Sequence, residues 1–268
     1  MYHGKRLDGK MRIIAGPCQH ETLEQSLEIA QECKRVCDKY GIEYYFKASY
    51  DKANRTSVNG KRGVGMVQTM KDFKQMKTSL EGLKILTDVH ETGDVENIQE
   101  WHNNAIDVLQ IPAFLCRRTD LIQAACRTDK IVNIKKGQFL APWDVKGILS
   151  KTEGAKEVWI TERGTSFGYN NLIVDYTGLM YMLDHFQCPI VFDCTHSAQR
   201  PGGLGDSSGG NRAYVPGLAR SGSAIGIRNF FMEVHPEPDL APSDGPNMLR
   251  LDDFEQVVKD VVAYHYER

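Results

Sequence analysis

The chain has 268 residues, of which 41% are hydrophobic and 25% charged, and its formal net charge is -2. These values are typical of a folded domain, and they exclude the basic excess of a nucleic-acid-binding protein and the charge runs of a disordered tail. No apolar stretch reaches the roughly 20 residues of a membrane span. The polar N-terminal segment MYHGKRLDGK carries no signal-peptide core, and seven cysteines are scattered along the chain. We therefore expect a protein of the reducing cytoplasm that binds neither nucleic acid nor membrane.

Short apolar runs alternate with helical segments from Met11 to the end of the chain. The runs are rich in Ile, Val, Phe or Tyr, as buried parallel strands are. The expected strands are Met11–Ile14, Tyr44–Ala48, Lys84–Asp88, Val108–Ile111, Ile131–Lys135, Val158–Glu162, Pro189–Asp193 and Asn229–Glu233. The expected helices are Leu23–Tyr40, Met66–Leu80, Gly93–Trp101, Asp120–Arg127, Val145–Ser150, Val174–His185, Tyr214–Ser221 and Leu251–Tyr266.

This alternation predicts a single α/β domain over residues 1–268, a (β/α)8 or TIM barrel. Such a barrel typically needs about 250 residues and would use the whole chain. An open, doubly wound sheet is the structural alternative. In barrel enzymes the active site lies at the C-terminal ends of the strands.

Each expected strand brings a polar or reactive group to this rim. The rim groups are Cys18, Lys47, Asp88 with His90, Gln110, Lys135, Glu162 with Arg163, Asp193 with His196, and Glu233. Asp88 and His90 are two positions apart and so face the same side of an extended strand. Charges inside an apolar barrel are costly unless partners or ligands stabilise them, so we interpret the rim as a catalytic or binding site.

Five rim and loop cations, Lys47, Lys52, Arg55, Lys135 and Arg163, form one group. At ~4 Å and an effective dielectric constant near 20, each like-charge pair costs about 4 kcal/mol. Several cations at one rim therefore indicate an anionic ligand, such as two phosphates or a phosphate and a carboxylate.

Four further residues form a possible metal site. Cys18, His196 and Glu233 follow strands that are neighbours in a closed barrel, and Asp244 on the loop after the last strand completes the set. A thiol, an imidazole and two carboxylates suit zinc, iron or manganese. The spacing forms no local metal-binding motif, and a buried structural thiol is the alternative for Cys18.

Long motifs then indicate a family. The runs are FKASYDKANRTS at 46–57, TDVHE at 87–91, QIPAFL at 110–115, RRTDL at 117–121, NIKKGQF at 133–139, ERGTSFGYNNLIVD at 162–175, FDCTHSAQRPGG at 192–203, SGGNRAYV at 208–215 and EVHPEPDLAPSDGPNML at 233–249. With these runs the chain resembles the 3-deoxy-D-manno-octulosonate 8-phosphate synthases over nearly its whole length. The resemblance implies a (β/α)8 barrel that condenses phosphoenolpyruvate with D-arabinose 5-phosphate and water for lipopolysaccharide synthesis.

The resemblance also implies roles for individual residues. Phosphoenolpyruvate would be held by Lys47, Lys52, Gln110, Ala113, Lys135 and Arg163. The arabinose phosphate would be held by Asn54, Arg55 and Ser57. The residues expected to take part in catalysis are Lys47, Asp88, His90 and His196. Phe114 and Arg117 would reach a neighbouring subunit's site in a homotetramer.

The run GPCQ at 16–19 resembles the metal-dependent form of the family, in which Cys18, His196, Glu233 and Asp244 would bind the ion. Three alternatives stay open at this point. They are a related synthase with another acceptor, such as erythrose 4-phosphate; a metal-dependent barrel hydrolase; and an inactive module that binds sugar phosphates.

Overall fold

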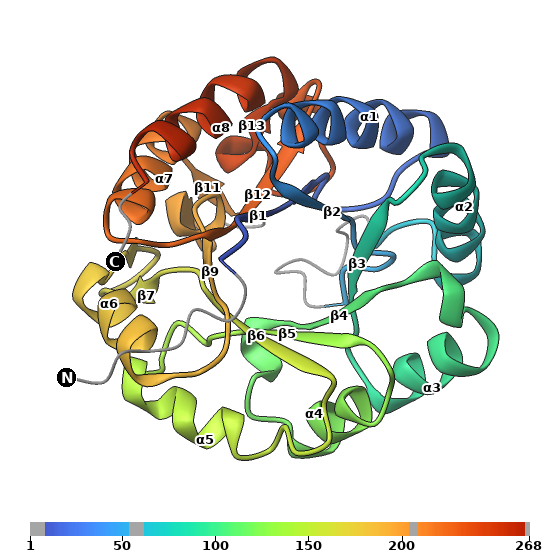
Figure 1. Cartoon of the computed structure of the whole chain (residues 1–268), viewed down its shortest axis with the longest axis horizontal. Helices are drawn as coiled ribbons and strands as arrows, with labels where there is room; N and C mark the ends of the chain where they lie inside the picture. Colours follow the sequence, from blue (N-terminus) through green and yellow to red (C-terminus); the bar gives the residue numbers. More distant parts are fainter. Residues whose placement is uncertain (1–8, 54–61, 204–207, 266–268) are drawn as a thin grey trace.

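A closed ring of eight parallel strands forms the centre of the molecule, and helices surround it (Figure 1). The computed structural model describes residues 9–53, 62–203 and 208–265. The strands follow one another around the ring in chain order, and pairing of the first with the last closes it. The (β/α)8 barrel predicted from the sequence is confirmed, and the open sheet is excluded.

The barrel strands are β1 (Arg12–Gly16), β2 (Glu43–Lys47), β3 (Lys84–Asp88), β4 (Val108–Ile111), β5 (Ile131–Lys135), β6 (Glu157–Glu162), β9 (Ile190–Asp193) and β12 (Asn229–His235). The surrounding helices are α1 (Leu23–Lys39), α2 (Met66–Ser79), α3 (Thr92–Trp101), α4 (Thr119–Cys126), α5 (Val145–Leu149), α6 (Tyr176–His185), α7 (Val215–Ala224) and α8 (Phe254–Ala263).

Helix α1 illustrates how the sequence places the outer layer. Thr22 caps its first turn by accepting a hydrogen bond from the Gln25 amide, as Thr at this position commonly does. Cys33 and Cys37 are four residues apart and fully buried against the barrel, in an apolar stripe at helical spacing. Gly41, with a φ of 68°, ends the helix in a left-handed turn.

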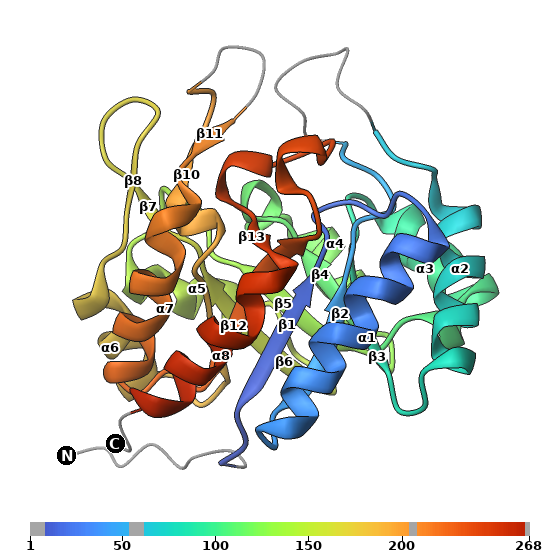
Figure 2. The same cartoon turned by 90° about the horizontal axis from the view of Figure 1, so that it is seen from above.

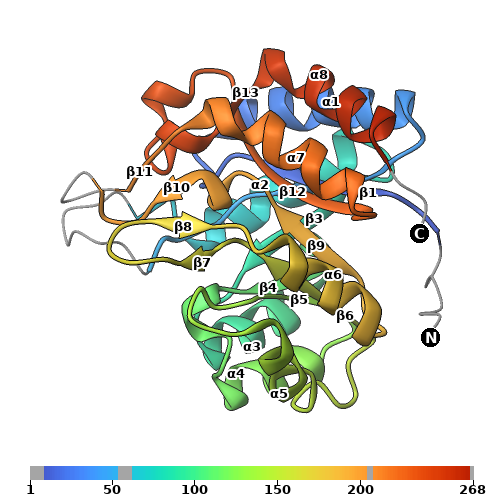
Figure 3. The same cartoon turned by 90° about the vertical axis from the view of Figure 1, so that its left-hand side faces the viewer.

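Five short strands were not predicted. They are β7 (Thr165–Ser166), β8 (Leu172–Ile173), β10 (Gln199–Arg200), β11 (Gly209–Gly210) and β13 (Leu249–Arg250). β7 pairs with β8 and β10 with β11, both antiparallel, while β13 extends the sheet beside β12. The two antiparallel pairs project from the same end of the barrel (Figures 2 and 3). This is the rim to which the carboxyl ends of the barrel strands point.

The barrel interior is layered because alternate residues of each strand point inwards. Its middle is a cluster of large apolar side chains, here called the apolar belt. The belt consists of Ile14, Tyr45, Leu86, Val108, Trp159, Val191 and Phe231, each no more than 2% exposed, with Ile131 packed against them. The belt fills the barrel between its two ends.

Polar side chains lie on either side of the belt. At the N-terminal end of the strands, Arg12 donates to Glu43 at 2.9 Å and to Asn229 at 3.3 Å, and Lys84 also pairs with Glu43. The Arg12 guanidinium lies 5.7 Å from the Trp159 ring centre. At the other end, the inward-facing residues two positions further along the strands include five groups predicted to form the site: Lys47, Asp88, Gln110, Asp193 and Glu233.

Candidate active site

Three buried cations lie above the apolar belt. Lys47, Lys135 and Arg163 are 2%, 5% and 7% exposed and come from the ends of β2, β5 and β6. Both lysine ammonium groups lie over the ring of Phe231, at 5.6 Å for Lys47 and 3.9 Å for Lys135. The structure therefore brings together three of the five cations predicted as one group; Lys52 lies at the same rim, and Arg55 lies outside the described residues.

Burial lowers the pKa of Lys135, and the nearby charges of Lys47 and Arg163 lower it further, against the opposing effect of Asp193. The cations thus repel one another in a setting that excludes water. A bound anion would relieve this repulsion, because it would supply the opposite charge at short range.

Asp193 is the principal partner of Lys135. Its Oδ2 accepts hydrogen bonds from the Lys135 ammonium at 2.7 Å and from His196 Nδ1 at 2.7 Å. Its Oδ1 accepts from the His196 amide and the Thr195 hydroxyl. Although burial opposes the charged form, His196 and Lys135 hold the pKa of Asp193 well below its usual range.

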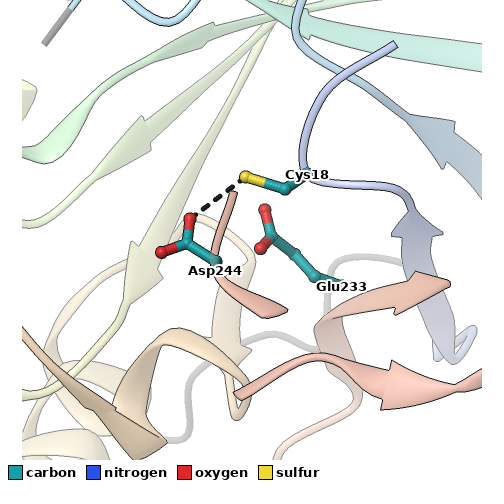
Figure 4. Close-up of side chains that lie close together, drawn as sticks. All are labelled: Cys18, Glu233 and Asp244. Carbon is teal, nitrogen blue, oxygen red and sulfur yellow. Dashed lines mark hydrogen bonds between the residues drawn. The ribbon is translucent and has the colours of Figure 1, made fainter. Parts of the chain in front are cut away.

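Three of the predicted metal ligands form a compact group. Cys18 on the β1–α1 loop, Glu233 on β12 and Asp244 on the following loop each offer a ligand atom, and these atoms lie within 4.8 Å of one another. Figure 4 shows the three side chains converging, with the Cys18 thiol donating to Asp244 Oδ2 at 3.1 Å. Asp244 has a φ of 56°, in the left-handed region that short polar residues tolerate best.

His196 faces the same group. Its Nε2 lies 3.5 Å from Glu233 Oε1 and 3.8 Å from Asp244 Oδ2. The other ring nitrogen, Nδ1, bonds to Asp193, an arrangement common behind histidines that bind metals. The structure therefore brings all four predicted ligands together.

These residues fit a divalent cation. Glu233 Oε2 is buried and has no hydrogen-bond partner among the described residues. Burial raises the pKa of the Cys18 thiol, and the charges of Glu233 and Asp244 raise it further. A cation among these groups would satisfy the free oxygen and favour the thiolate, the form of Cys that binds metals.

Asp88 and His90 form a second pair at the rim, with Oδ2 and Nε2 3.2 Å apart. Although burial opposes both charged forms, their contact lowers the pKa of Asp88 and raises that of His90. Lys52 lies close enough for its charge to act on both. Burial lowers the pKa of Lys52, but nearby Cys18 and Asp88 raise it overall. Lys52 therefore contributes positive charge to the same rim.

The remaining predicted residues fall into three groups. Gln110 is buried beside Asn133, whose amide donates to it at 3.4 Å, and Ala113 is 6% exposed on the β4–α4 loop. Phe114 is 63% exposed, and Arg117 lies 5.5 Å from the exposed Phe139 ring. The predictions for Asn54, Arg55 and Ser57 lie outside the described residues.

Two residues of this site received no role in the sequence analysis. Asp193 stood among the rim groups, but its position at a strand end did not show that it serves two partners. Gln199 lies in β10 and bonds to both Arg163 and Asp244. No local pattern marks Gln199, since a glutamine in a loop is usually an exposed polar residue.

Glu162 was expected among the rim groups, but its carboxylate contacts Lys136 and the backbone and not the buried cations above the belt. Its carboxylate lies 3.1 Å from the Lys136 ammonium and accepts from the backbone amides of Arg163 and Gly164. These contacts shape the turn that presents Arg163. Glu162 is therefore a structural support for the cation beside it.

The chain is similar in sequence to one protein family and to several curated proteins. The family model described as the DAHP synthetase I family matches residues 2–265. A curated protein from Caulobacter vibrioides is 50% identical over 257 residues, covering 95% of this chain and 88% of its own. One from Nitrobacter hamburgensis is 49% identical over 259 residues, covering 96% and 88%. One from Rickettsia bellii is 50% identical over 254 residues, covering 94% and 90%.

All three relatives are named 2-dehydro-3-deoxyphosphooctonate aldolase. The family model covers the whole barrel, including every described residue of the candidate site. The chain belongs to the DAHP synthetase I family.

Proposed function

We propose that this protein condenses phosphoenolpyruvate with D-arabinose 5-phosphate and water, and releases 3-deoxy-D-manno-octulosonate 8-phosphate and inorganic phosphate for lipopolysaccharide synthesis. One observation carries the proposal: a buried group of three cations lies at the barrel mouth of a chain half identical to proteins named 2-dehydro-3-deoxyphosphooctonate aldolase. Phosphoenolpyruvate carries a carboxylate and a phosphate, which suit such a group.

Lys135 and Arg163 would hold the anionic groups of phosphoenolpyruvate, together with Lys52, Gln110 and the Ala113 amide. Fixed in this way, its C3 attacks the aldehyde carbon of the acceptor, and water adds at C2. The tetrahedral adduct then loses phosphate by cleavage of its C2–O bond. Positioning alone can supply roughly 7–11 kcal/mol of the barrier reduction.

Lys47 provides electrostatic stabilisation and proton transfer, because its ammonium faces the same space from the end of β2. The Asp88–His90 pair is a candidate proton donor, since Asp88 raises the pKa of His90 and so favours the protonated imidazole. His196 acts together with Glu233 and Asp244, which its Nε2 faces. The proposed catalytic set is Lys47, Asp88, His90 and His196.

Cys18, His196, Glu233 and Asp244 would bind a divalent zinc, iron or manganese ion. When bound, such an ion polarises an aldehyde oxygen or lowers the pKa of a water molecule. The chain's own contribution is to orient the ligands: Asp193 fixes the His196 ring so that Nε2 faces the carboxylates. The family's metal-dependent form, indicated by Cys18, is thus part of the proposal.

We also propose a homotetramer in the cytoplasm. Phe114 and Arg117 would reach a neighbouring subunit's site, and the Phe114 side chain is 63% exposed, so its ring is available for such a contact. All seven cysteines are free, in agreement with a reducing compartment. Among the described residues, the helices are too short or too polar to cross a membrane.

The test is phosphate release from phosphoenolpyruvate with arabinose 5-phosphate, with and without a chelator. We expect release that the chelator abolishes and a divalent ion restores. Erythrose 4-phosphate serves as the competing acceptor. Release with erythrose 4-phosphate alone would assign another acceptor, release that resists the chelator would remove the metal from the proposal, and no release with either acceptor would overturn the proposal.

A further inference from the structure

Two candidate metal ligands are tied to different cations of the anion site. The Lys47 ammonium lies 3.2 Å from Glu233 Oε1. Lys135 reaches His196 through the carboxylate of Asp193, which accepts at 2.7 Å from each. The buried cations and the candidate metal ligands are therefore joined by hydrogen bonds, directly between Lys47 and Glu233 and through Asp193 between Lys135 and His196.

Gln199 makes the third connection. Its side-chain oxygen accepts from Arg163 Nη2 at 2.8 Å, and its side-chain nitrogen donates to Asp244 Oδ1 at 2.6 Å. Gln199 is 8% exposed, and pairing of β10 with β11 holds its backbone. The second carboxylate oxygen of Asp244 points to Cys18, so the bond to Gln199 sets which oxygen faces the ligand group.

We propose that Gln199 is a positioning residue that couples anion binding at Arg163 to divalent-ion binding at Asp244. This inference rests on the proposed function, because it takes phosphoenolpyruvate as the anion and the four ligands as the metal site. It adds a residue and a thermodynamic linkage between the two ligands.

The chemistry of the two partners explains why an amide stands here. Arg163 can only donate hydrogen bonds, and the carboxylate of Asp244 can only accept them. A primary amide satisfies both with one neutral group, whereas a carboxylate would repel Asp244 and a hydrocarbon would remove the bonds to Arg163 Nη2 and Asp244 Oδ1. The amide orientation is also fixed, since the reversed one would place oxygen against oxygen.

The sign of the coupling follows from the charges. Without an anion, Lys47, Lys135 and Arg163 repel a divalent ion bound nearby. An anion among them offsets this repulsion and holds Arg163, which in turn holds Gln199 and Asp244 in place. Phosphoenolpyruvate should therefore tighten divalent-ion binding, and the ion should tighten phosphoenolpyruvate binding by the same factor.

The experiment measures zinc affinity by competition with a chromophoric chelator, with and without phosphoenolpyruvate, in the absence of acceptor. Calorimetry gives phosphoenolpyruvate affinity with and without zinc. For the unaltered protein we expect phosphoenolpyruvate to tighten zinc binding by about 5–150-fold, the usual range of such couplings. Gln199→Met keeps the length of the side chain and removes both hydrogen bonds.

For Gln199→Met we expect zinc affinity to fall by about 10–100-fold, as is typical when a ligand loses its outer partner. The coupling factor should fall as well. Arg212→Met is the matched control, because Arg212 bonds to Gly245 O at 2.9 Å and supports the Asp244 loop without contacting Arg163 or Asp244. This variant should weaken zinc binding equally with and without phosphoenolpyruvate, which leaves the coupling factor unchanged.

An unchanged coupling factor in Gln199→Met overturns the inference, as does an equal loss of coupling in Arg212→Met, which would assign the effect to loop support. Absence of zinc binding by the unaltered protein would overturn it together with the proposed metal site. The synthase reaction is tested separately by product formation, so its failure and that of the linkage are distinguishable.

Discussion

The ammonium of Lys47 lies 3.2 Å from Glu233 Oε1, and both side chains are enclosed by the barrel, at 2% and 0% exposed. Lys47 also donates to the Cys18 carbonyl at 2.9 Å. The second carboxylate oxygen of Glu233 has no hydrogen-bond partner among the described residues. The pair thus joins β2 to β12 across β1 and leaves one acidic oxygen for another cation.

Replacing Lys47 should harm both stability and activity. Lys47→Met leaves Glu233 buried without its cation, which should cost about 3–5 kcal/mol in the free energy of unfolding. Turnover should fall by about 10²–10³-fold, as when a stabilising donor is removed. Zinc should recover part of the lost stability. Lys77→Met, which breaks a half-exposed pair with Asp107, is the control and should cost at most about 1 kcal/mol in urea unfolding. Equal costs would contradict this account.

Replacing the thiol should separate metal dependence from catalysis. Cys18→Asn removes the only sulfur from the ligand group and keeps a small polar side chain at that position. We expect activity that resists chelators, because the anion-holding cations are untouched. Phosphate release with and without chelator measures this. Complete loss of activity in a folded protein that still binds phosphoenolpyruvate would refute the expectation.

Asp193→Asn should disturb both groups at once. Asparagine keeps the shape of the side chain but removes the charge that Lys135 and His196 share. We expect kcat/KM for phosphoenolpyruvate to fall by about 10–100-fold, together with weaker zinc binding. Steady-state kinetics and chelator competition measure the two effects. A loss confined to one of them would show that Asp193 serves a single partner.

The Asp88–His90 pair should make stability depend on pH in a defined direction. The pKa of His90 is raised above its ordinary value of about 6.5, so its contribution is complete below that pH and is lost as pH rises through the folded pKa. The pKa of Asp88 is lowered, so its contribution is present above about 3.9 and is lost as pH falls through the folded pKa.

We therefore expect the stability difference between the unaltered protein and His90→Gln to be largest between about pH 4 and about pH 6.5. It should shrink at higher pH. Urea unfolding at a series of pH values measures it. A difference that grows as pH rises would have the wrong sign for a protonated His90 paired with Asp88.

Gly16→Ala should displace Lys47. A Cβ at Gly16 would lie 2.2 Å from the Lys47 carbonyl oxygen, so the strand end must shift. We expect a loss of about 1–3 kcal/mol in the free energy of unfolding and a clear loss of turnover. Gly147→Ala on α5 meets no atom within 4 Å and serves as the control, with a small gain in stability. Comparable behaviour of the two variants in thermal unfolding would contradict the close contact.

The sequence was sufficient to predict the barrel because each of its strands is short, apolar and separated from the next by a helix. The small strands were missed because two-residue pairs such as β7 and β8 have no periodicity to detect. The final helix begins at Phe254, three residues later than predicted, because Leu251–Asp253 forms a 3-10 turn first.

Much of the candidate site was also predictable, because in a closed parallel barrel the order of the strands alone places the residues at their carboxyl ends on one rim. Asp193 and Gln199 illustrate the limit. Each acts by bonding to two side chains from distant parts of the chain, Lys135 and His196 in one case and Arg163 and Asp244 in the other. Such roles depend on distances of a few ångströms, which spacing along a sequence does not contain.

The apolar belt closes the interior of the barrel below the buried cations. Phe231 and the other belt residues form the floor of this site, directly beneath Lys47 and Lys135. Whatever binds at the cations must therefore arrive and depart by the same opening. A second molecule seated nearer the mouth would block this opening, so we expect the deeper ligand to bind first.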